Sequence, residues 1–152
     1  MSAPHRCGHV AVVGRTNAGK STLVNALVGE KVAIVSPTPQ TTRTIVIGIR
    51  NRPGAQVILV DTPGFHKPLH ELNRRMMREA EGSLEGVDAL IAVVDASDRP
   101  GRGDDFVLQR VRDSGAPFVI ALNKTDRMSR KGDLLPLIER YWELGPKAVV
   151  PV

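Results

Sequence analysis

The sequence predicts an α/β fold: a mostly parallel sheet with one antiparallel strand and helices on both faces. Short apolar runs that fit buried strands alternate with longer stretches that fit helices, the order typical of β-α-β units. A glycine-rich turn joins the first apolar run to the first helical stretch. A Pro-Gly turn at 53–54 separates two consecutive strand-like runs, which predicts the antiparallel pair.

The first half of the chain supplies three of the predicted strands. The apolar run at 10–13 is the first strand, and the helix at 19–28 follows the glycine-rich turn. Gly29 is the expected end of that helix, because glycine commonly follows the last helical residue. The next two strands are predicted at 44–50 and 55–60, as antiparallel neighbours around the turn.

The second half continues the alternation. A helix is predicted at 72–84, where Leu72, Met76 and Ala80 recur every four residues along one face. The remaining strands are predicted at 89–94, 117–122 and 148–152, and the remaining helices at 104–113 and 134–142.

Composition fits one globular domain. The chain has 152 residues, of which 41% are hydrophobic and 24% charged, enough for a single buried core. Cys7 is the only cysteine, so an internal disulfide is excluded and a reduced cytosol is expected. The longest apolar run, at 89–94, is far shorter than the roughly 18 residues that a membrane span needs. The N-terminus has no signal-peptide pattern.

The glycine-rich turn matches the phosphate-loop pattern Gly-x4-Gly-Lys-Ser at every position. Its residues are Gly14, Arg15, Thr16, Asn17, Ala18, Gly19, Lys20 and Ser21, followed by Thr22. Backbone N–H groups of such a loop surround phosphates, and the helix dipole favours the same negative charge. Lys20 is expected to reach the β- and γ-phosphates, and Ser21 to bind Mg²⁺. This context predicts a nucleotide site of the P-loop NTPase kind.

The predicted base is guanine. A buried strand is followed directly by Asn123-Lys124-Thr125-Asp126, at the edge where ligands of open α/β sheets bind. Guanine presents two adjacent donors that the Asp126 carboxylate can accept, whereas adenine would leave it unpaired. Asn123 is expected to bridge base and phosphate loop, and the stem of Lys124 to lie along the base. The predicted ligand is GTP or GDP, so the fold is a G domain.

A third motif, Asp61-Thr62-Pro63-Gly64, follows another short apolar strand. Asp61 is expected to hold Mg²⁺ through water, and the Gly64 N–H to meet the γ-phosphate where the absence of Cβ allows close approach. Asp-x-Pro-Gly is also ordinary turn chemistry, but its place after the phosphate loop favours the functional interpretation. Upstream, the proline-broken stretch at 36–43 supplies hydroxyls for the metal and the γ-phosphate.

Together these motifs resemble the Era family of ribosome-assembly GTPases, over nearly the whole chain. The specific signals are Gln40-Thr41-Thr42-Arg43, the strand at 45–49, and Phe65-His66-Lys67-Pro68 after Gly64. The resemblance implies that Thr42, just before the arginine, is a metal ligand with Ser21 and Asp61. It also implies that Lys20, Asn17, Thr42 and Gly64 serve catalysis. Thr16 stands where the family usually has proline, which only pre-sets φ in a loop.

The resemblance also sets expectations for domains and partners. Residues 1–152 are expected to form a G domain that lacks the family's last guanine-contacting loop, its last helix and its RNA-binding KH domain. The implied partners are the small ribosomal subunit and its rRNA, and a net charge of +5 fits them. The basic residues between 66 and 78 fit either RNA or a solvated helix face. The resemblance implies a cytoplasmic protein and allows peripheral association with the inner membrane.

Three functions stay open. The first is a GTP-hydrolysing switch in small-subunit assembly and rRNA maturation. The second is a nucleotide-binding interaction module with negligible hydrolysis. The third is the G domain of a tRNA-modifying or tandem GTPase, although such relatives usually carry an acidic residue where this chain has Thr44.

Water activation is expected to be weak. In Ras-like enzymes a glutamine after the Asp-x-x-Gly motif orients the attacking water. Phe65 occupies that position here and cannot form hydrogen bonds, so slow intrinsic hydrolysis is predicted. In potassium-activated relatives the asparagine equivalent to Asn17 binds K⁺ beside the β- and γ-phosphates. Asn17 therefore either binds K⁺ or only shapes the loop through its own backbone hydrogen bonds.

Overall fold

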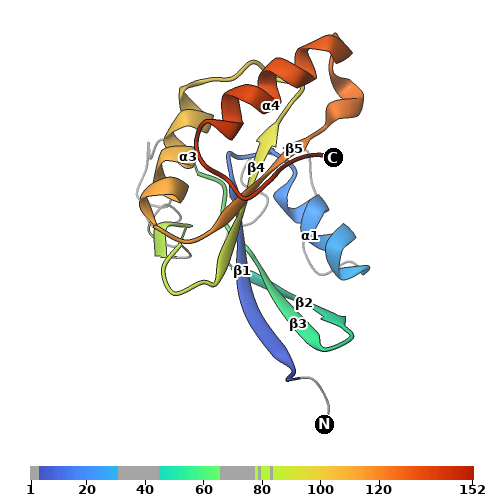
Figure 1. Cartoon of the computed structure of the whole chain (residues 1–152), viewed down its shortest axis with the longest axis vertical. Helices are drawn as coiled ribbons and strands as arrows, with labels where there is room; N and C mark the ends of the chain where they lie inside the picture. The colour runs from blue at the N-terminus through green and yellow to red at the C-terminus, as the bar shows by residue number, and fades with distance from the viewer. Residues whose placement is uncertain (1–3, 31–44, 66–77, 79, 83) are drawn as a thin grey trace.

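A computed structural model describes residues 4–30, 45–65, 78, 80–82 and 84–152 of the chain. These residues form a six-stranded sheet in the order β2-β3-β1-β4-β5-β6 (Figure 1). The strands are β1 (Arg6–Gly14), β2 (Val46–Arg52), β3 (Ala55–Asp61), β4 (Ala89–Asp95), β5 (Phe118–Asn123) and β6 (Val149–Pro151). β2 is antiparallel to β3, and all other neighbours are parallel. The predicted fold class is confirmed.

Helices cover both faces of the sheet. In the described part of the chain, the helices that the structure describes from end to end are α1 (Lys20–Val28), α3 (Arg102–Asp113) and α4 (Leu134–Trp142), with short 3-10 helices at Thr125–Arg127 and Lys131–Asp133. α1 packs through Val24 and Val28 on one face. α3 and α4 pack on the opposite face, where Leu108 and Leu137 enter the larger core. Among the described residues, no helix combines the length and apolar character that crossing a membrane requires.

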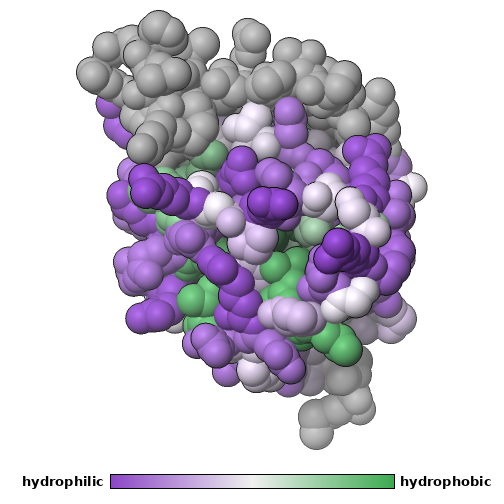
Figure 2. Space-filling model, turned by 90° about the horizontal axis from the view of Figure 1, so that it is seen from above, coloured by the Kyte–Doolittle hydropathy of each residue, from purple (hydrophilic) through white to green (hydrophobic). Residues whose placement is uncertain are grey.

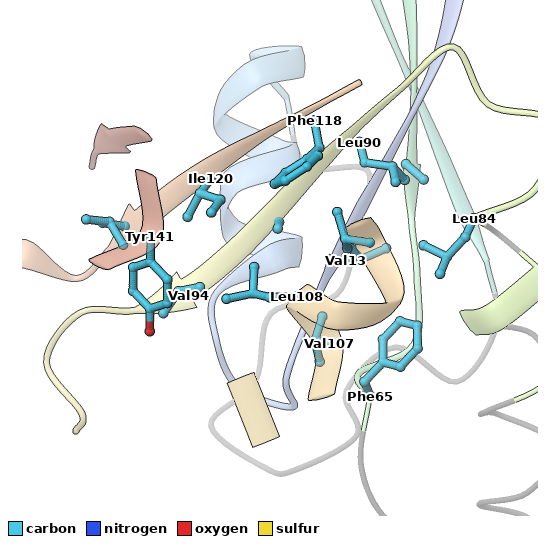
Figure 3. Packing of buried hydrophobic residues seen from close by; sticks show 14 of the residues in the cluster. Val13, Phe65, Leu84, Leu90, Val94, Val107, Leu108, Phe118, Ile120 and Tyr141 are labelled. Carbon is cyan, nitrogen blue, oxygen red and sulfur yellow. The ribbon is translucent and has the colours of Figure 1, made fainter. Parts of the chain in front are cut away.

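Both faces of the central strands are buried, which explains their continuous apolar sequences. Val12 of β1 belongs to the core beneath α1, whereas its neighbours Ala11 and Val13 belong to the core beneath α3 and α4. This alternation follows from the two-residue period of a strand. Figure 3 shows the larger core, in which side chains of the sheet and of α3 gather around Leu108. Each fully buried aliphatic side chain contributes about 1.5–3 kcal/mol.

Most predicted elements have the observed bounds within two residues. The helix at 134–142 agrees at both ends, and α3 begins two residues before the predicted 104. β1 begins at Arg6 rather than at residue 10, because residues 6–9 pair with β3 although they are polar or exposed. The helix predicted at 72–84 lies mostly outside the described residues. Within that range, residues 78 and 80–82 are described as helical.

The topology gathers the predicted motifs at one edge. β1, β3, β4 and β5 are parallel, so their carboxyl ends meet on the same side of the sheet. The strands end there at Gly14, Asp61, Asp95 and Asn123. Figure 2 shows the molecule from the top of the view in Figure 1. Among the coloured residues on that surface, hydrophilic ones predominate. A polar ligand site is therefore expected on this edge.

Candidate nucleotide site

The backbone of the phosphate loop has a conformation that few residues tolerate. Asn17 and Gly19 have positive φ angles of 63° and 100°. Asparagine reaches this region more easily than most residues, and glycine adopts it without strain. A Cβ on Gly19 would also collide with the side-chain amide of Asn123. α1 begins at the next residue, Lys20, so the positive end of the helix dipole faces the loop.

Lys20 is a buried cation at this helix terminus. Lys20 is 6% exposed, and its Nζ donates a hydrogen bond of 2.8 Å to the Arg15 carbonyl. Burial lowers the pKa of Lys20 to about 8, against the opposing attraction of Asp61. A buried cation of this kind is stabilised by a neighbouring anion. The position suits a phosphate.

Ser21 and Asp61 meet from different elements and fit a magnesium ion. The Ser21 hydroxyl donates a 2.7 Å hydrogen bond to Oδ2 of Asp61, which is fully buried at the end of β3. Mg²⁺ is usually held by one or two such oxygens together with substrate phosphates and waters. Within the described ranges, no group of three or more His, Cys, Asp or Glu could hold a metal. The third predicted ligand, Thr42, lies outside the described residues.

The Asp-Thr-Pro-Gly motif packs directly on the phosphate loop. The buried Thr62 hydroxyl donates a 2.8 Å hydrogen bond to the carbonyl of Val12, and Pro63 beside it is buried as well. Gly64 approaches the loop so closely that a Cβ there would lie 2.7 Å from Cα of Thr16. Only glycine therefore fits at position 64 without displacing the loop.

Phe65 is turned into the core. Its backbone N–H donates a 3.0 Å hydrogen bond to the Gly14 carbonyl, which fixes the segment to the phosphate loop. Phe65 is 2% exposed and lies in the larger core (Figure 3). Its ring meets that of Phe106 of α3 edge-on at a centroid distance of 6.4 Å. A buried aromatic ring cannot orient an attacking water, in line with the sequence-based expectation.

Residues 123–126, predicted to bind guanine and called the tetrad from here on, lie against the phosphate loop although the two are about a hundred residues apart in sequence. Nδ2 of Asn123 donates a 2.9 Å hydrogen bond to the Ala18 carbonyl. Nζ of Lys124 donates a 2.7 Å hydrogen bond to the Asn17 carbonyl. Asp126 is exposed in the first 3-10 helix. Asn123 thus contacts the phosphate loop, and its contact with a base stays a prediction.

Sequence reasoning missed Asp95, which supports the tetrad. Its Oδ2 accepts a 2.6 Å hydrogen bond from Nζ of Lys124, and its Oδ1 accepts from the backbone and hydroxyl of Ser97. Burial alone would raise the pKa of Asp95, but these hydrogen bonds outweigh it and hold the pKa below its ordinary value. A signal existed in the sequence: Asp95 ends an apolar strand at the ligand edge.

Sequence reasoning also missed an ion pair between the phosphate loop and α3. The Arg15 guanidinium lies 3.1 Å from Asp104 in the first turn of α3 and 3.6 Å from Asp98. Burial raises the pKa of Asp104, although Arg15 opposes the shift. The pair lies beside a cavity of about 230 Å³ lined by Arg15, Thr16, Asn17, Ala18, Asp95, Asp98, Asp104 and Lys124. No local pattern predicts this pairing, because it depends on tertiary packing.

The chain is similar to known GTPases along most of its length. Residues 9–124 match the family of 50S ribosome-binding GTPases. GTPase Era of Stenotrophomonas maltophilia strain K279a is 52% identical over 141 residues, which are 92% of this chain and 47% of that protein. GTPase Era of Pseudomonas aeruginosa strain LESB58 is 49% identical over 154 residues, covering 100% of this chain and 50% of that protein.

Solved structures agree. A crystal structure of Era in complex with MgGDPNP and nucleotides 1506–1542 of 16S ribosomal RNA has a TM-score of 0.88 and 36% identity, over 96% of this chain and 50% of that chain. The crystal structure of an Aquifex aeolicus Era variant bound to GDP·AlF4⁻ has a TM-score of 0.86 and 35% sequence identity, over 96% of this chain and 50% of that chain. This chain spans about half the length of these relatives. The chain belongs to the family of 50S ribosome-binding GTPases, and its sequence and fold are similar to those of Era.

Proposed function

We propose that this chain is a G domain, over residues 1–152, that binds GTP or GDP with Mg²⁺ and hydrolyses GTP slowly. One observation carries the proposal: the tetrad residues Asn123 and Lys124 are hydrogen-bonded to carbonyls of the phosphate loop. This arrangement supports a single ligand that has a guanine base at one end and phosphates at the other.

The proposed roles follow from the positions of the side chains. Lys20 neutralises negative charge on the β- and γ-phosphates from its buried site at the start of α1. Ser21 and Asp61 hold Mg²⁺, which would supply further positive charge to the same phosphates. Gly64 offers its N–H to the γ-phosphate. Thr42, outside the described residues, is proposed as the hydroxyl that joins metal and γ-phosphate.

Slow hydrolysis is proposed because Phe65 belongs to the core. No glutamine stands at that position to orient water, so the reaction depends on phosphate positioning and on charge stabilisation. Asn17 remains a candidate K⁺ ligand, with loop shaping as its alternative role. Stimulation of wild type by KCl over NaCl at equal ionic strength, lost in Asn17→Ala, would favour the K⁺ role.

We also propose that the whole protein acts in small-subunit assembly through rRNA, because one similar structure is Era with a 16S ribosomal RNA fragment. In the described part of this chain, Arg127, Arg130 and Lys131 are exposed near the tetrad and suit a phosphate-rich partner. The proposed location is the cytoplasm, with peripheral association at the inner membrane as a finer proposal.

Competition binding and phosphate release test the proposal. A fluorescent GDP should bind in the presence of Mg²⁺ and be displaced by GTP and GDP, but not by ATP at the same concentrations. Purified chain should then release phosphate from GTP in a slow single turnover. Equal displacement by ATP would overturn the guanine assignment. Tight GTP binding without phosphate release would instead favour the interaction module.

A further inference from the structure

The hydroxyl of Thr16 is an unusual polar group in the phosphate loop. Oγ1 is buried and has no hydrogen-bond partner among the described residues. Buried hydroxyls are nearly always paired, because an unpaired one loses its hydrogen bonds to water without replacement. A threonine hydroxyl can donate one hydrogen bond and accept others, so Thr16 retains a full capacity to bind a ligand.

The position of Thr16 points to the phosphate end of the ligand. A Cβ on Gly64 would meet Oγ1 of Thr16 at 2.8 Å, so this hydroxyl lies directly beside Gly64. The Gly64 N–H is the group proposed to meet the γ-phosphate. The hydroxyl therefore lies beside the proposed position of the third phosphate.

Three carbonyls of the loop already accept hydrogen bonds from side chains. The Arg15 carbonyl accepts from Lys20, the Asn17 carbonyl from Lys124, and the Ala18 carbonyl from Asn123, as three separate side-chain hydrogen bonds. The nearby aromatic residue, Phe65, offers no acceptor. Phosphate oxygens are acceptors only, and their negative charge makes a hydrogen bond from a hydroxyl short and strong.

We propose that the Thr16 hydroxyl donates a hydrogen bond to the third phosphate of bound GTP. The contact exists only with GTP, because GDP has no third phosphate. It therefore adds to the preference for GTP over GDP and stabilises charge on that phosphate during hydrolysis. This inference rests on the proposed binding of guanine nucleotides.

Two substitutions test the hydroxyl separately from the shape of the side chain. Thr16→Val keeps the branched shape and removes the hydroxyl, whereas Thr16→Ser keeps the hydroxyl and removes the methyl group. Dissociation constants are measured for GDP and for the non-hydrolysable analogue GDPNP. The rate of phosphate release from GTP is measured in a single turnover. Thr16→Val should weaken the binding of GDPNP about tenfold or more, since hydrogen bonds to charged groups are the stronger ones. The dissociation constant for GDP should stay within about twofold of the wild-type value. Thr16→Ser should keep the wild-type ratio.

Other results would overturn the inference. If Thr16→Val leaves both dissociation constants unchanged, the inference is contradicted. An equal loss of affinity for GDPNP and GDP would also contradict it, because it would indicate a role in loop shape alone. In either case wild-type nucleotide binding, and with it the proposed function, would stand. A wild type that binds neither nucleotide would refute the proposed function and the inference together. If the valine variant does not fold by circular dichroism, Thr16→Ala replaces it in the same comparison.

Discussion

Lys20 and Lys124 both donate hydrogen bonds to carbonyls of the phosphate loop, but they lie in two differently built halves of the site. Lys20, in the phosphate half, is 6% exposed and its pKa is lowered to about 8 by burial. Lys124, in the base half, forms a 2.6 Å ion pair with Asp95. The base half thus neutralises its own cation, whereas the phosphate half holds a cation whose burial is poorly compensated.

This difference indicates where the ligand is needed. For Lys20 the cost of burial exceeds the attraction of Asp61, so this lysine is costly to fold and gains most when an anion binds beside it. An ion-paired lysine is already stabilised and mainly fixes the position of the loop that carries it. On the proposed function, the phosphate half would therefore trade stability for binding, and the base half would provide a rigid frame for recognition of guanine.

The largest effect is expected when the buried cation is removed. Lys20→Met should lower GDP affinity by about a hundredfold or more, because several charge-assisted hydrogen bonds are lost. In the absence of nucleotide the same change should raise the free energy of unfolding at pH 7 by roughly 1–2 kcal/mol, since a desolvated charge disappears. Titration calorimetry and urea denaturation measure the two effects.

The pH dependence sharpens this prediction. The pKa of Lys20 is about 8 in the folded chain against an ordinary 10.5, so the unfolded state binds more protons between these values. The stability of the unliganded wild type should therefore gain a contribution as pH rises from 8 to 10.5, and the advantage of Lys20→Met should shrink over that range. A constant difference between the two proteins from pH 7 to 10.5 would argue against a buried, desolvated lysine.

The next effect concerns the base. Asp126→Asn replaces the carboxylate proposed to accept from two guanine donors with an amide that can donate to the C2 carbonyl of xanthine. GDP affinity should fall about tenfold to a hundredfold, and xanthosine diphosphate should bind better than it does to wild type. Competition against a fluorescent nucleotide measures both. A variant that keeps the wild-type preference for GDP would remove Asp126 from the account.

The smallest effect is expected at the ion pair of the base half. Asp95→Asn keeps the shape of the side chain but removes the charge that Lys124 faces. GDP affinity should fall by about threefold to tenfold, with the preference for guanine over adenine retained, because Lys124 keeps its hydrogen bond to the Asn17 carbonyl. Thr125→Ser, in the same tetrad but outside the ion pair, is the matched control. A loss as large as that of Asp126→Asn would show that the base half is not a rigid frame.

The sequence was sufficient for the fold class and for which residues meet at the ligand edge, because both follow from local patterns. The phosphate loop, Asp61 and the tetrad each follow a strand, and parallel strands bring their carboxyl ends together. The first residues of β1 were missed because pairing with β3, not hydrophobicity, keeps them in the sheet.

The supporting contacts could not be predicted in the same way. Asp104 meets Arg15 only because α3 packs beside the phosphate loop, 89 residues further along the chain. The unpartnered hydroxyl of Thr16 likewise depends on how closely Gly64 approaches. The roles of Thr42 and of the basic residues at 67, 74 and 75 stay predictions, because these positions lie outside the described residues.

The most direct test of the central claim is an NMR titration of the Lys20 side chain, alone, with MgGDP and with MgADP. In the unliganded chain the pKa should be near 8, as burial dictates. Saturating MgGDP should raise it by about one unit or more, since the phosphates supply the missing negative charge, whereas MgADP at the same concentration should leave it unchanged. A pKa near the ordinary 10.5 without ligand, or the same rise with MgADP, would contradict the account.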